Sequence, residues 1–325
     1  MRNLKPNEQS ILERICMMND KKLLKLLNEI LAKRFKKTIA TNDYLFAQGD
    51  APILLVAHLD TVFNPQPTNI FYDTRKNVMW SSEGLGADDR AGVFAVLQII
   101  QSGLRPSVLF LMGEESGGVG ASAFIKAYPK PIDNFKYIVE LDRCGSNDCV
   151  FYNCDNVEFE EYIENFGFVT NFGTFTDISI LCPVWKIAGV NLSIGYENEH
   201  SYRETLHISA LLDTIKKVKT MIQQIDKSDS FEYIEYFKSY NRFTFPSEND
   251  DYFNFKVKCK SCGKLFSDFD AFPVKGLNGS TVYYCPDCMD DNKVHWCKRC
   301  QEPYEINKLA NDSGYCEDCN KDILK

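Results

Sequence analysis

The stretch that decides the fold is ILLVAHLD, residues 53–60, in which a continuous apolar run ends in a histidine and an aspartate. A short apolar run of this kind is typical of a strand that is buried on both faces. Further apolar runs alternate with helical patterns down to about residue 225, which is characteristic of a mostly parallel sheet covered by helices. We therefore predict an α/β fold, a three-layer sandwich around a mixed, mostly parallel sheet.

The elements expected around this strand follow from hydrophobic periodicity and turn residues. The predicted strands are 53–57, 107–112, 137–141 and 190–195, with a hairpin formed by 70–73 and 78–81. The predicted helices are 8–37, 91–102, 121–128, 157–166 and 205–225. The first helix is basic and amphipathic, and we interpret it as a surface helix packed by one face rather than as a membrane-binding helix.

Size and composition limit the possible classes of protein. The 325 residues suffice for one large domain and a small one, and 44% hydrophobic residues are ample for a packed core. A net charge of −8 argues against a general nucleic-acid binder. We find no membrane-spanning run and no apolar core of a signal peptide near the N-terminus, so we expect a cytoplasmic protein.

The cysteines are concentrated near the C-terminus. Eight of the thirteen form four Cys-x-x-Cys pairs, which is the spacing of zinc ligands rather than of disulfides. Pairing them in sequence gives two zinc-ribbon modules, about 256–291 and 292–325, each with one structural zinc; crossed pairing is the alternative. The acidic balance of this tail favours a protein partner over nucleic acid. The eight residues are Cys259, Cys262, Cys285, Cys288, Cys297, Cys300, Cys316 and Cys319.

The predicted domains are thus a catalytic domain over 1–226, a linker or packed arm over 227–255 and the zinc-ribbon tail over 256–325. The first of these contains polar segments, most of which follow predicted strands. Together they supply two imidazoles and four or five carboxylates, enough to hold a pair of divalent metals and to provide a general base. The segments are 58–60 (HLD), 86–92 (GADDRAG), 113–115 (GEE), 140–142 (ELD) and 199–201 (EHS).

Three local features support a catalytic interpretation of these segments. His58 and Asp60 share one face of an extended stretch, so Asp60 could accept the second imidazole proton. The adjacent Glu114 and Glu115 point in different directions, so one can bind metal while the other handles protons. A bridging aspartate with one histidine and one carboxylate per ion would leave an open coordination position. Each segment also has a structural alternative: the aspartates at 88 and 89 could merely cap a helix.

Taken together, these segments resemble the co-catalytic di-zinc exopeptidases, the superfamily of zinc aminopeptidases, peptidase T and glutamate carboxypeptidases. The resemblance covers about residues 20–226. It implies that His58 and Asp142 bind one metal, that Glu115 and His200 bind the other, and that Asp88 bridges the two.

The resemblance also implies catalytic roles. Asp60 would orient His58, and Glu114 would be the general acid and base acting on a water that bridges two zinc ions; cobalt or manganese also suits these ligands. The loop around Asp177 loosely resembles a substrate-side loop, so Asp177 would meet the substrate amine. The intervals between the ligands are too short for an accessory lid domain, so an open site is expected.

The implied function is hydrolysis of peptide bonds by an aminopeptidase or a di/tripeptidase. One alternative uses the same metals to cleave N-acyl amino acids. An alternative of another class is a catalytically inactive zinc-ribbon adaptor that binds a protein partner.

Overall fold

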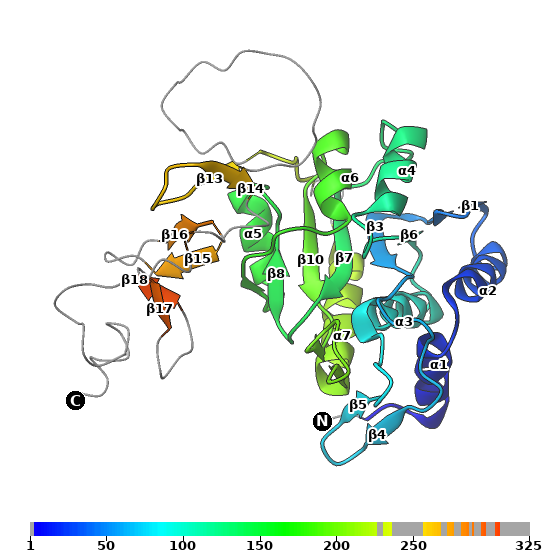
Figure 1. The fold of residues 1–325 in the computed structure, drawn as a ribbon. Coiled ribbons are helices and arrows are strands. Elements are labelled where there is room, and N and C mark those ends of the chain that lie inside the picture. Colours follow the sequence, from blue (N-terminus) through cyan, green and yellow to red (C-terminus); the bar gives the residue numbers. More distant parts are fainter. Residues whose placement is uncertain are drawn as a thin grey trace. The chain divides into compact units, whose positions relative to one another are not determined.

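The computed structural model describes residues 3–225, 230–235, 256–267, 272–275, 281–285, 288, 294–296 and 303–305. The chain divides into two compact units, Met1–Ser239 and Tyr240–Lys325. The elements of both units are labelled in Figure 1.

An eight-stranded mixed sheet forms the centre of the larger unit, with the strand order β1-β2-β6-β3-β7-β10-β8-β9. The four central strands β6, β3, β7 and β10 pair in parallel, whereas β1, β2 and β8 introduce antiparallel pairs. The predicted mostly parallel sheet is therefore confirmed. The strands are β1 Lys37–Ala40, β2 Tyr44–Gln48, β3 Ala51–His58, β6 Pro106–Leu111, β7 Tyr137–Arg143, β8 Asp148–Val150, β9 Val169–Thr170 and β10 Gly189–Ser193.

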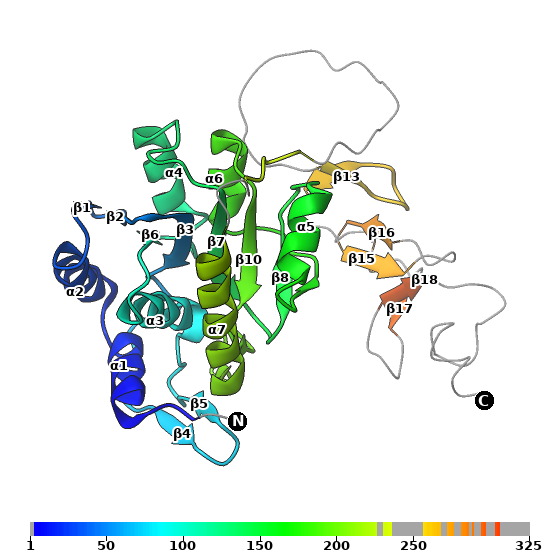
Figure 2. The ribbon, with the colours of Figure 1, turned by 180° about the vertical axis from the view of Figure 1, so that it is seen from behind.

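Helices cover both faces of this sheet (Figures 1 and 2). Helices α3 (Ala87–Gln101) and α7 (Ile208–Gln224) contact each other on one face, and α4 (Val119–Ala127) and α6 (Ile178–Trp185) contact each other on the opposite face. Helix α5 (Val157–Glu164) lies beside β9. The three-layer arrangement predicted from the alternation of strands and helices is thus confirmed.

The N-terminal helix predicted over 8–37 is wrong in one respect, because the chain forms two helices there, α1 (Pro6–Cys16) and α2 (Asp20–Ala32). The side chain of Asn19 caps the second helix by accepting the amide N–H of Lys21 at 3.2 Å. The fully buried guanidinium of Arg90 donates to the carbonyls of Ile15 and Met18 at 2.9 and 3.0 Å and pairs with the first residue of α2. The break between the helices therefore accommodates a buried cation from α3.

A small second sheet lies at the edge of the larger unit, with the order β11-β12-β5-β4. It confirms the predicted hairpin, since β4 (Phe71–Asp73) and β5 (Val78–Trp80) are antiparallel. The helix predicted over 205–225 begins too early, because residues 205–207 form β12 (Thr205–His207). This strand pairs with β11 (Tyr196–Glu197). The second sheet thereby fixes the base of a loop formed by residues 198–204.

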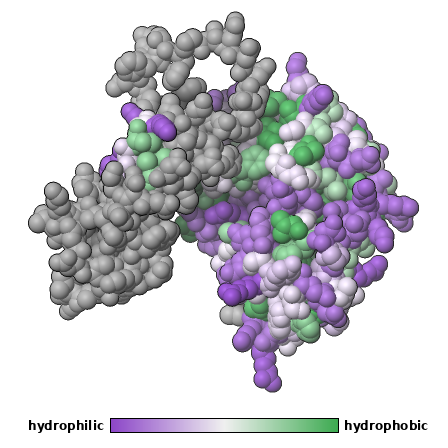
Figure 3. All heavy atoms as spheres, viewed as in Figure 1, coloured by the Kyte–Doolittle hydropathy of each residue, from purple (hydrophilic) through white to green (hydrophobic). Residues whose placement is uncertain are grey.

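Apolar residues are concentrated inside this unit rather than on its surface. Figure 3 shows polar side chains over most of the visible face, with apolar ones scattered among them. Scattered exposed apolar residues of this kind are normal for globular proteins. In the described part of the chain, every helix is too short or too polar to cross a membrane.

Residues 230–235, which belong to the segment predicted as a linker or packed arm, pack against the larger unit. The amide N–H of Phe231 donates to the carbonyl of Lys136 at 3.0 Å, and the carbonyl of Phe231 accepts from Ala188 at 2.9 Å. The Phe231 ring lies 5.0 Å from the ring of Phe159 and 5.1 Å from that of Tyr162, centroid to centroid. These contacts attach the arm to the sheet end and to α5.

Replacement of Phe231 by alanine should lower the free energy of unfolding by about 2 kcal/mol, because a half-buried aromatic ring loses both apolar contact and ring–ring packing. The matched control is Ile234→Ala in the same arm, where the side chain is 49% exposed. Chemical denaturation of the two variants measures the difference. Equal midpoints for both variants would show that the arm does not stabilise the domain.

The smaller unit contains short strands around a cysteine cluster. Ligand atoms of Cys259, Cys262, Cys285 and Cys288 all lie within 4.8 Å of one another, which fits the predicted zinc-ribbon module with sequential pairing. The other four predicted ligands, Cys297, Cys300, Cys316 and Cys319, lie outside the described residues. The strands are β13 Lys256–Lys258, β14 Leu265–Ser267, β15 Phe272–Lys275, β16 Thr281–Tyr284, β17 Val294–Trp296 and β18 Pro303–Glu305.

Candidate metal centre and active site

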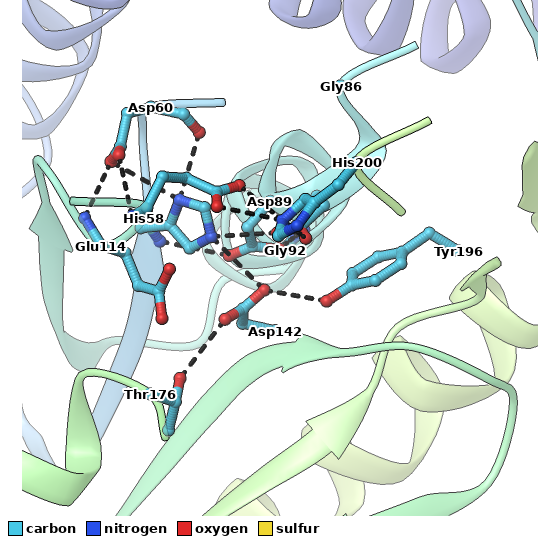
Figure 4. Close-up of polar contacts among 12 residues, drawn as sticks. His58, Asp60, Gly86, Asp89, Gly92, Glu114, Asp142, Thr176, Tyr196 and His200 are labelled. Carbon is cyan, nitrogen blue, oxygen red and sulfur yellow. Dashed lines mark hydrogen bonds and ion pairs between the residues drawn. The ribbon is translucent and has the colours of Figure 1, made fainter. Parts of the chain in front are cut away.

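The polar segments singled out in the sequence converge at the carboxyl ends of the parallel strands, where α/β sheets place functional groups. His58 ends β3, and Asp142 lies near the end of β7. Glu114 and Glu115 follow β6, Asp88 lies in the first turn of α3, and His200 lies in the loop between β11 and β12. Three central strands, one helix start and one hairpin therefore build a single site (Figure 4).

The first candidate metal site consists of His58, Asp88 and Asp142, whose ligand atoms lie within 4.8 Å of one another. The His58 Nε2 atom is 3.0 Å from Oδ1 of Asp88 and 3.4 Å from Oδ1 of Asp142. All three side chains are buried. Three ligand atoms of this kind can hold one divalent cation and leave a further coordination position open.

The second candidate site consists of Asp88, Glu115 and His200, again with ligand atoms within 4.8 Å of one another. The His200 Nε2 atom is 3.2 Å from Oδ2 of Asp88 and 3.0 Å from the carboxylate of Glu115. Asp88 therefore presents Oδ1 to one imidazole and Oδ2 to the other. The five residues expected as ligands fall into two groups that share one carboxylate.

The electrostatics of this cluster fit a pair of cations. Burial, together with like charges, raises the pKa of Asp142 to about 6, that of Glu115 to about 7 and that of Glu114 to about 9. Such shifts mean that neighbouring carboxylates repel one another when no cation lies among them. Mixed imidazole and carboxylate ligands suit zinc and also cobalt or manganese.

The imidazoles respond to the same negative surroundings. A hydrogen bond to Asp88 is the main cause that raises the pKa of His200 to about 9, although partial burial opposes it. Burial alone would lower the pKa of His58, but the adjacent carboxylates, Asp142 first among them, outweigh burial and raise it. The cluster thus attracts positive charge, which is the property that a metal site needs.

Asp60 orients the loop that follows β6 more closely than it orients the imidazole of His58. Its Oδ1 atom accepts the amide N–H of Gly113 at 2.7 Å and that of Glu114 at 3.3 Å, and its Oδ2 atom accepts that of Glu115 at 3.2 Å. The Nδ1 atom of His58 lies 3.1 Å from the main-chain carbonyl of Asp60 but 3.6 Å from its carboxylate. The backbone carbonyl is therefore the nearer partner of the imidazole.

The two adjacent aspartates have different functions in the fold. Asp88 faces both imidazoles, whereas the buried carboxylate of Asp89 accepts the amide N–H of Gly92 at 2.9 Å and that of His58 at 3.1 Å. The helix-capping alternative considered for the pair thus describes Asp89. A Cβ atom at position 92 would lie 2.2 Å from the carbonyl of Leu141, so only glycine allows α3 to approach β7 this closely.

Asp142 is fixed by three polar side chains. The buried amide of Asn191 on β10 accepts the Asp142 N–H at 2.9 Å and donates to its carbonyl at 2.8 Å. The Tyr196 hydroxyl donates to Oδ1 of Asp142 at 3.1 Å, and the Thr176 hydroxyl donates to Oδ2 at 3.3 Å (Figure 4). These contacts orient the carboxylate toward the imidazole of His58.

Asp177, expected from the resemblance to meet a substrate amine, lies at the N-terminal end of α6 and is fully buried. Within the described part of the chain, neither of its carboxylate oxygens has a hydrogen-bond partner, and the same holds for Oε1 of buried Glu140. Burial raises the pKa of Asp177 to about 7, and burial together with the charge of Asp177 raises that of Glu140. Contact between Asp177 and a substrate would require movement of the residues that bury it.

Several residues of the site were not predicted from the sequence. Asn191 is the one with a visible signal, because it interrupts an otherwise apolar buried strand. Glu204, whose buried carboxylate accepts the amide N–H of Gly86 at 2.6 Å and that of Asp88 at 3.0 Å, has no local signal at all. The others are Thr176 and Tyr196.

Comparison with known families and structures agrees with this geometry. Residues 41–167 match the model of peptidase family M28. A search of curated protein sequences found no match.

The fold is similar to those of several solved peptidase structures. A tripeptidase from Staphylococcus aureus aligns with a TM-score of 0.54 and 13% identity, covering 66% of this chain and 97% of that chain. The aminopeptidase PepT from Bacillus cereus gives a TM-score of 0.52 and 14% identity over 66% and 97% of the two chains. A TET aminopeptidase from a Thaumarchaeota archaeon gives 0.51 and 12% over 69% and 98%.

At these identities, the structural likeness shows the fold, and the family match identifies the domain. The matched residues contain His58, Asp88, Glu114, Glu115 and Asp142, and His200 joins them in space. Residues 41–167 are thus similar to peptidase family M28, and together with the two ligand groups this similarity identifies the chain as a metallopeptidase of the di-zinc exopeptidase superfamily.

Proposed function

We propose that this protein is an aminopeptidase or a di/tripeptidase whose site holds two divalent metals, most simply zinc. The observation that carries the proposal is the pair of ligand groups that share Asp88, with Oδ1 facing His58 and Oδ2 facing His200. His58, Asp88 and Asp142 would hold one ion, and Asp88, Glu115 and His200 the other. Bound there, the ions would polarise the scissile carbonyl and make an attacking water more acidic.

Glu114 is the proposed general base and acid. Its half-buried side chain enters the same space as His58 and Asp142 (Figure 4). Its carboxylate takes a proton from the attacking water as the new carbon–oxygen bond forms, and then gives that proton to the amine as the carbon–nitrogen bond breaks. Burial is the chief cause that raises the pKa of Glu114 in the metal-free site, and two bound cations would lower that pKa, so that the carboxylate can both accept and return a proton.

The carboxyl of Asp177, which is not one of the proposed metal ligands, favours a substrate with a free N-terminal amine. The carboxyl of Asp177 raises the pKa of both Glu114 and Glu140, so it contributes to the negative potential near the general base. A free α-ammonium group is attracted by this potential, whereas an N-acyl amino acid carries a carboxylate and no ammonium group. We therefore place the aminopeptidase ahead of the N-acyl amino acid hydrolase, and we propose that Asp177 contributes to recognition of the amine.

The discriminating experiment compares a dipeptide and a tripeptide with their N-acetylated forms on the purified full-length chain. We expect at least a 100-fold preference in kcat/KM for the free amines. We also expect loss of hydrolysis in a chelator and recovery on addition of zinc, cobalt or manganese. Equal or faster cleavage of the acetylated forms would favour the amidohydrolase, and no cleavage of either form by the metal-loaded protein would favour the inactive adaptor.

The cysteine tail is proposed to hold two structural zinc ions and to offer a surface to a protein partner. The cluster of Cys259, Cys262, Cys285 and Cys288 supports the first of these sites. Metal analysis of the purified chain should then find about four ions, two in the active site and two in the tail. About two ions would show that one half of this assignment is wrong.

A further inference from the structure

The loop that carries His200 has little support of its own. Residues 198–204 connect β11 to β12, and the strands pair only through Tyr196 with Leu206 and Glu197 with Thr205. The His200 side chain is 52% exposed. Both Asn198 and His200 have positive φ angles, 57° and 58°, in a region that side chains other than that of glycine rarely adopt. The conformation that presents His200 to Asp88 therefore needs to be held by other contacts.

Local hydrogen bonds shape this loop without attaching it to the rest of the domain. The Ser201 hydroxyl donates to the carbonyl of Asn198 at 2.7 Å and accepts the amide N–H of Arg203 at 3.2 Å. The amide N–H of Glu204 donates to the carbonyl of Ser201 at 3.0 Å. These three bonds fold the loop on itself.

Glu204 supplies the buried attachment, in addition to the exposed Tyr202 ring, which packs against Phe63, and to Glu199, which is hydrogen-bonded to Cys144. The fully buried carboxylate of Glu204 accepts the amide N–H of Gly86 through Oε2 at 2.6 Å and that of Asp88 through Oε1 at 3.0 Å. These amides precede the regular part of α3, because Asp88 and Asp89 have non-helical φ and ψ angles. The carboxylate of Glu204 thus satisfies buried backbone amides that the helix itself does not pair.

We propose that Glu204 is a positioning residue for the second metal site. It fixes the loop of His200 to the backbone of Asp88, and so sets the separation between two ligands of one ion. This inference rests on the proposed two-metal function. It goes further because it proposes that the carboxylate of Glu204 maintains the geometry of the site formed by Asp88, Glu115 and His200.

The effect should be larger at the second site. Asp88 belongs to both sites, but the other two ligands of the first site are held independently of Glu204. His58 and Asp142 lie on buried strands of the parallel sheet, and their backbones are held by Asp89 and Asn191. The second site instead takes Glu115 and His200 from two loops. The loop of Glu115 is held by Asp60, and the loop of His200 is held by Glu204 and by the Tyr202 ring, which lies 5.9 Å from the ring of Phe63, centroid to centroid.

The test is the variant Glu204→Gln, studied by metal titration of the full-length, metal-free protein. Glutamine keeps the length of the side chain, but its NH2 group cannot accept a backbone N–H, so one of the two bonds is lost. Mn²⁺ is the probe, with free ion counted by electron paramagnetic resonance, because manganese prefers oxygen and nitrogen ligands to the thiolates of the tail. Substitution of a residue that supports a metal ligand typically weakens metal binding by about 10- to 100-fold.

We expect wild type to bind two Mn²⁺ ions, and Glu204→Gln to keep the first affinity within about twofold while the second weakens at least about tenfold. The matched control is Glu8→Gln. Glu8 is also a buried glutamate at a helix start, where it accepts the amide N–H of Lys5 at 2.8 Å, but it belongs to α1. The control should bind both ions as wild type does, which separates positioning from a general loss of a buried carboxylate.

Three results would overturn the inference. Wild-type affinity at both sites of Glu204→Gln would show that the carboxylate is not needed, and equal weakening at both sites would show a general structural role. If wild type itself binds fewer than two Mn²⁺ ions, the proposed two-metal function fails, and the inference fails with it. Because wild type is measured first, the two kinds of failure are distinguished.

Discussion

Replacement of Glu114 by glutamine should lower kcat by about 10³-fold or more while both active-site metals stay bound. Glutamine has nearly the same shape, but its amide can neither take a proton from water nor return one to the leaving amine. The loop should keep its position because Asp60 holds it through backbone amides rather than through the side chain of Glu114. Steady-state kinetics and metal analysis of the same preparation measure both halves of this expectation.

A suitable control is Glu197→Gln, which changes an exposed glutamate on β11, where its carboxylate lies 3.4 Å from the Nε2 atom of His207. This variant should retain turnover within a few-fold of wild type. Hydrolysis by Glu114→Gln at a rate close to wild type would refute the role of general base. Loss of metal together with activity would instead identify Glu114 as a ligand.

Replacement of Asp88 by alanine should remove both active-site ions and abolish measurable turnover. Each imidazole loses a partner, since Nε2 of His58 lies 3.0 Å and Nε2 of His200 lies 3.2 Å from this carboxylate. The two remaining groups would keep two ligands each, fewer than the three that catalytic metal sites usually provide. Mn²⁺ titration should therefore find neither site occupied at concentrations that saturate wild type.

Comparison with Asp142→Ala makes this expectation specific to a shared ligand. Asp142 belongs to the first group alone, so its loss should release one ion and leave the site of Glu115 and His200 able to bind. Retention of one ion by Asp88→Ala would mean that the carboxylate serves a single site. The two variants together thus count how many ions depend on each aspartate.

The parts of the fold that could be predicted from sequence are those determined by local pattern. Strands β3 and β6 contain continuous apolar runs and β7 begins with one, and all three lie in the buried centre of the sheet. Helix α6 was missed because it is short, strongly apolar and contains Pro183, so its periodicity does not distinguish it from a buried strand. The edge strands β1 and β9, the strand β2 next to β1, and the short β8, β11 and β12 were missed as well.

The break between α1 and α2 could not be predicted because its cause is distant in sequence. The guanidinium of Arg90 lies in the break and donates to the carbonyl of Met18, although the two residues are 72 positions apart in the sequence. Periodicity continues across the break, and the one local signal there is Asn19, a residue type preferred as an N-cap. A tertiary contact overrides the helical pattern in this case.

The candidate site likewise has residues that local sequence indicates and residues that it does not. Histidines and acidic residues after apolar runs indicate the ligands, because few other arrangements place such groups at strand ends. The same pattern does not indicate the residues that hold the ligands, because these come from distant parts of the sequence. Glu204 contacts Gly86 from 118 positions away, and Asn191 contacts Asp142 from 49 positions away. A single glutamate in a loop carries no sign of its partner until the fold is known.

Asp60 is a single anchor for two different tasks. Through three backbone amides it fixes both Glu114, the proposed proton carrier, and Glu115, a proposed ligand. Metal binding by Glu115 and proton transfer by Glu114 consequently both depend on the position of this one loop. Glu114 and Glu115 can be changed one at a time by evolution or design. A change of Asp60, which holds both, must alter metal binding and proton transfer together.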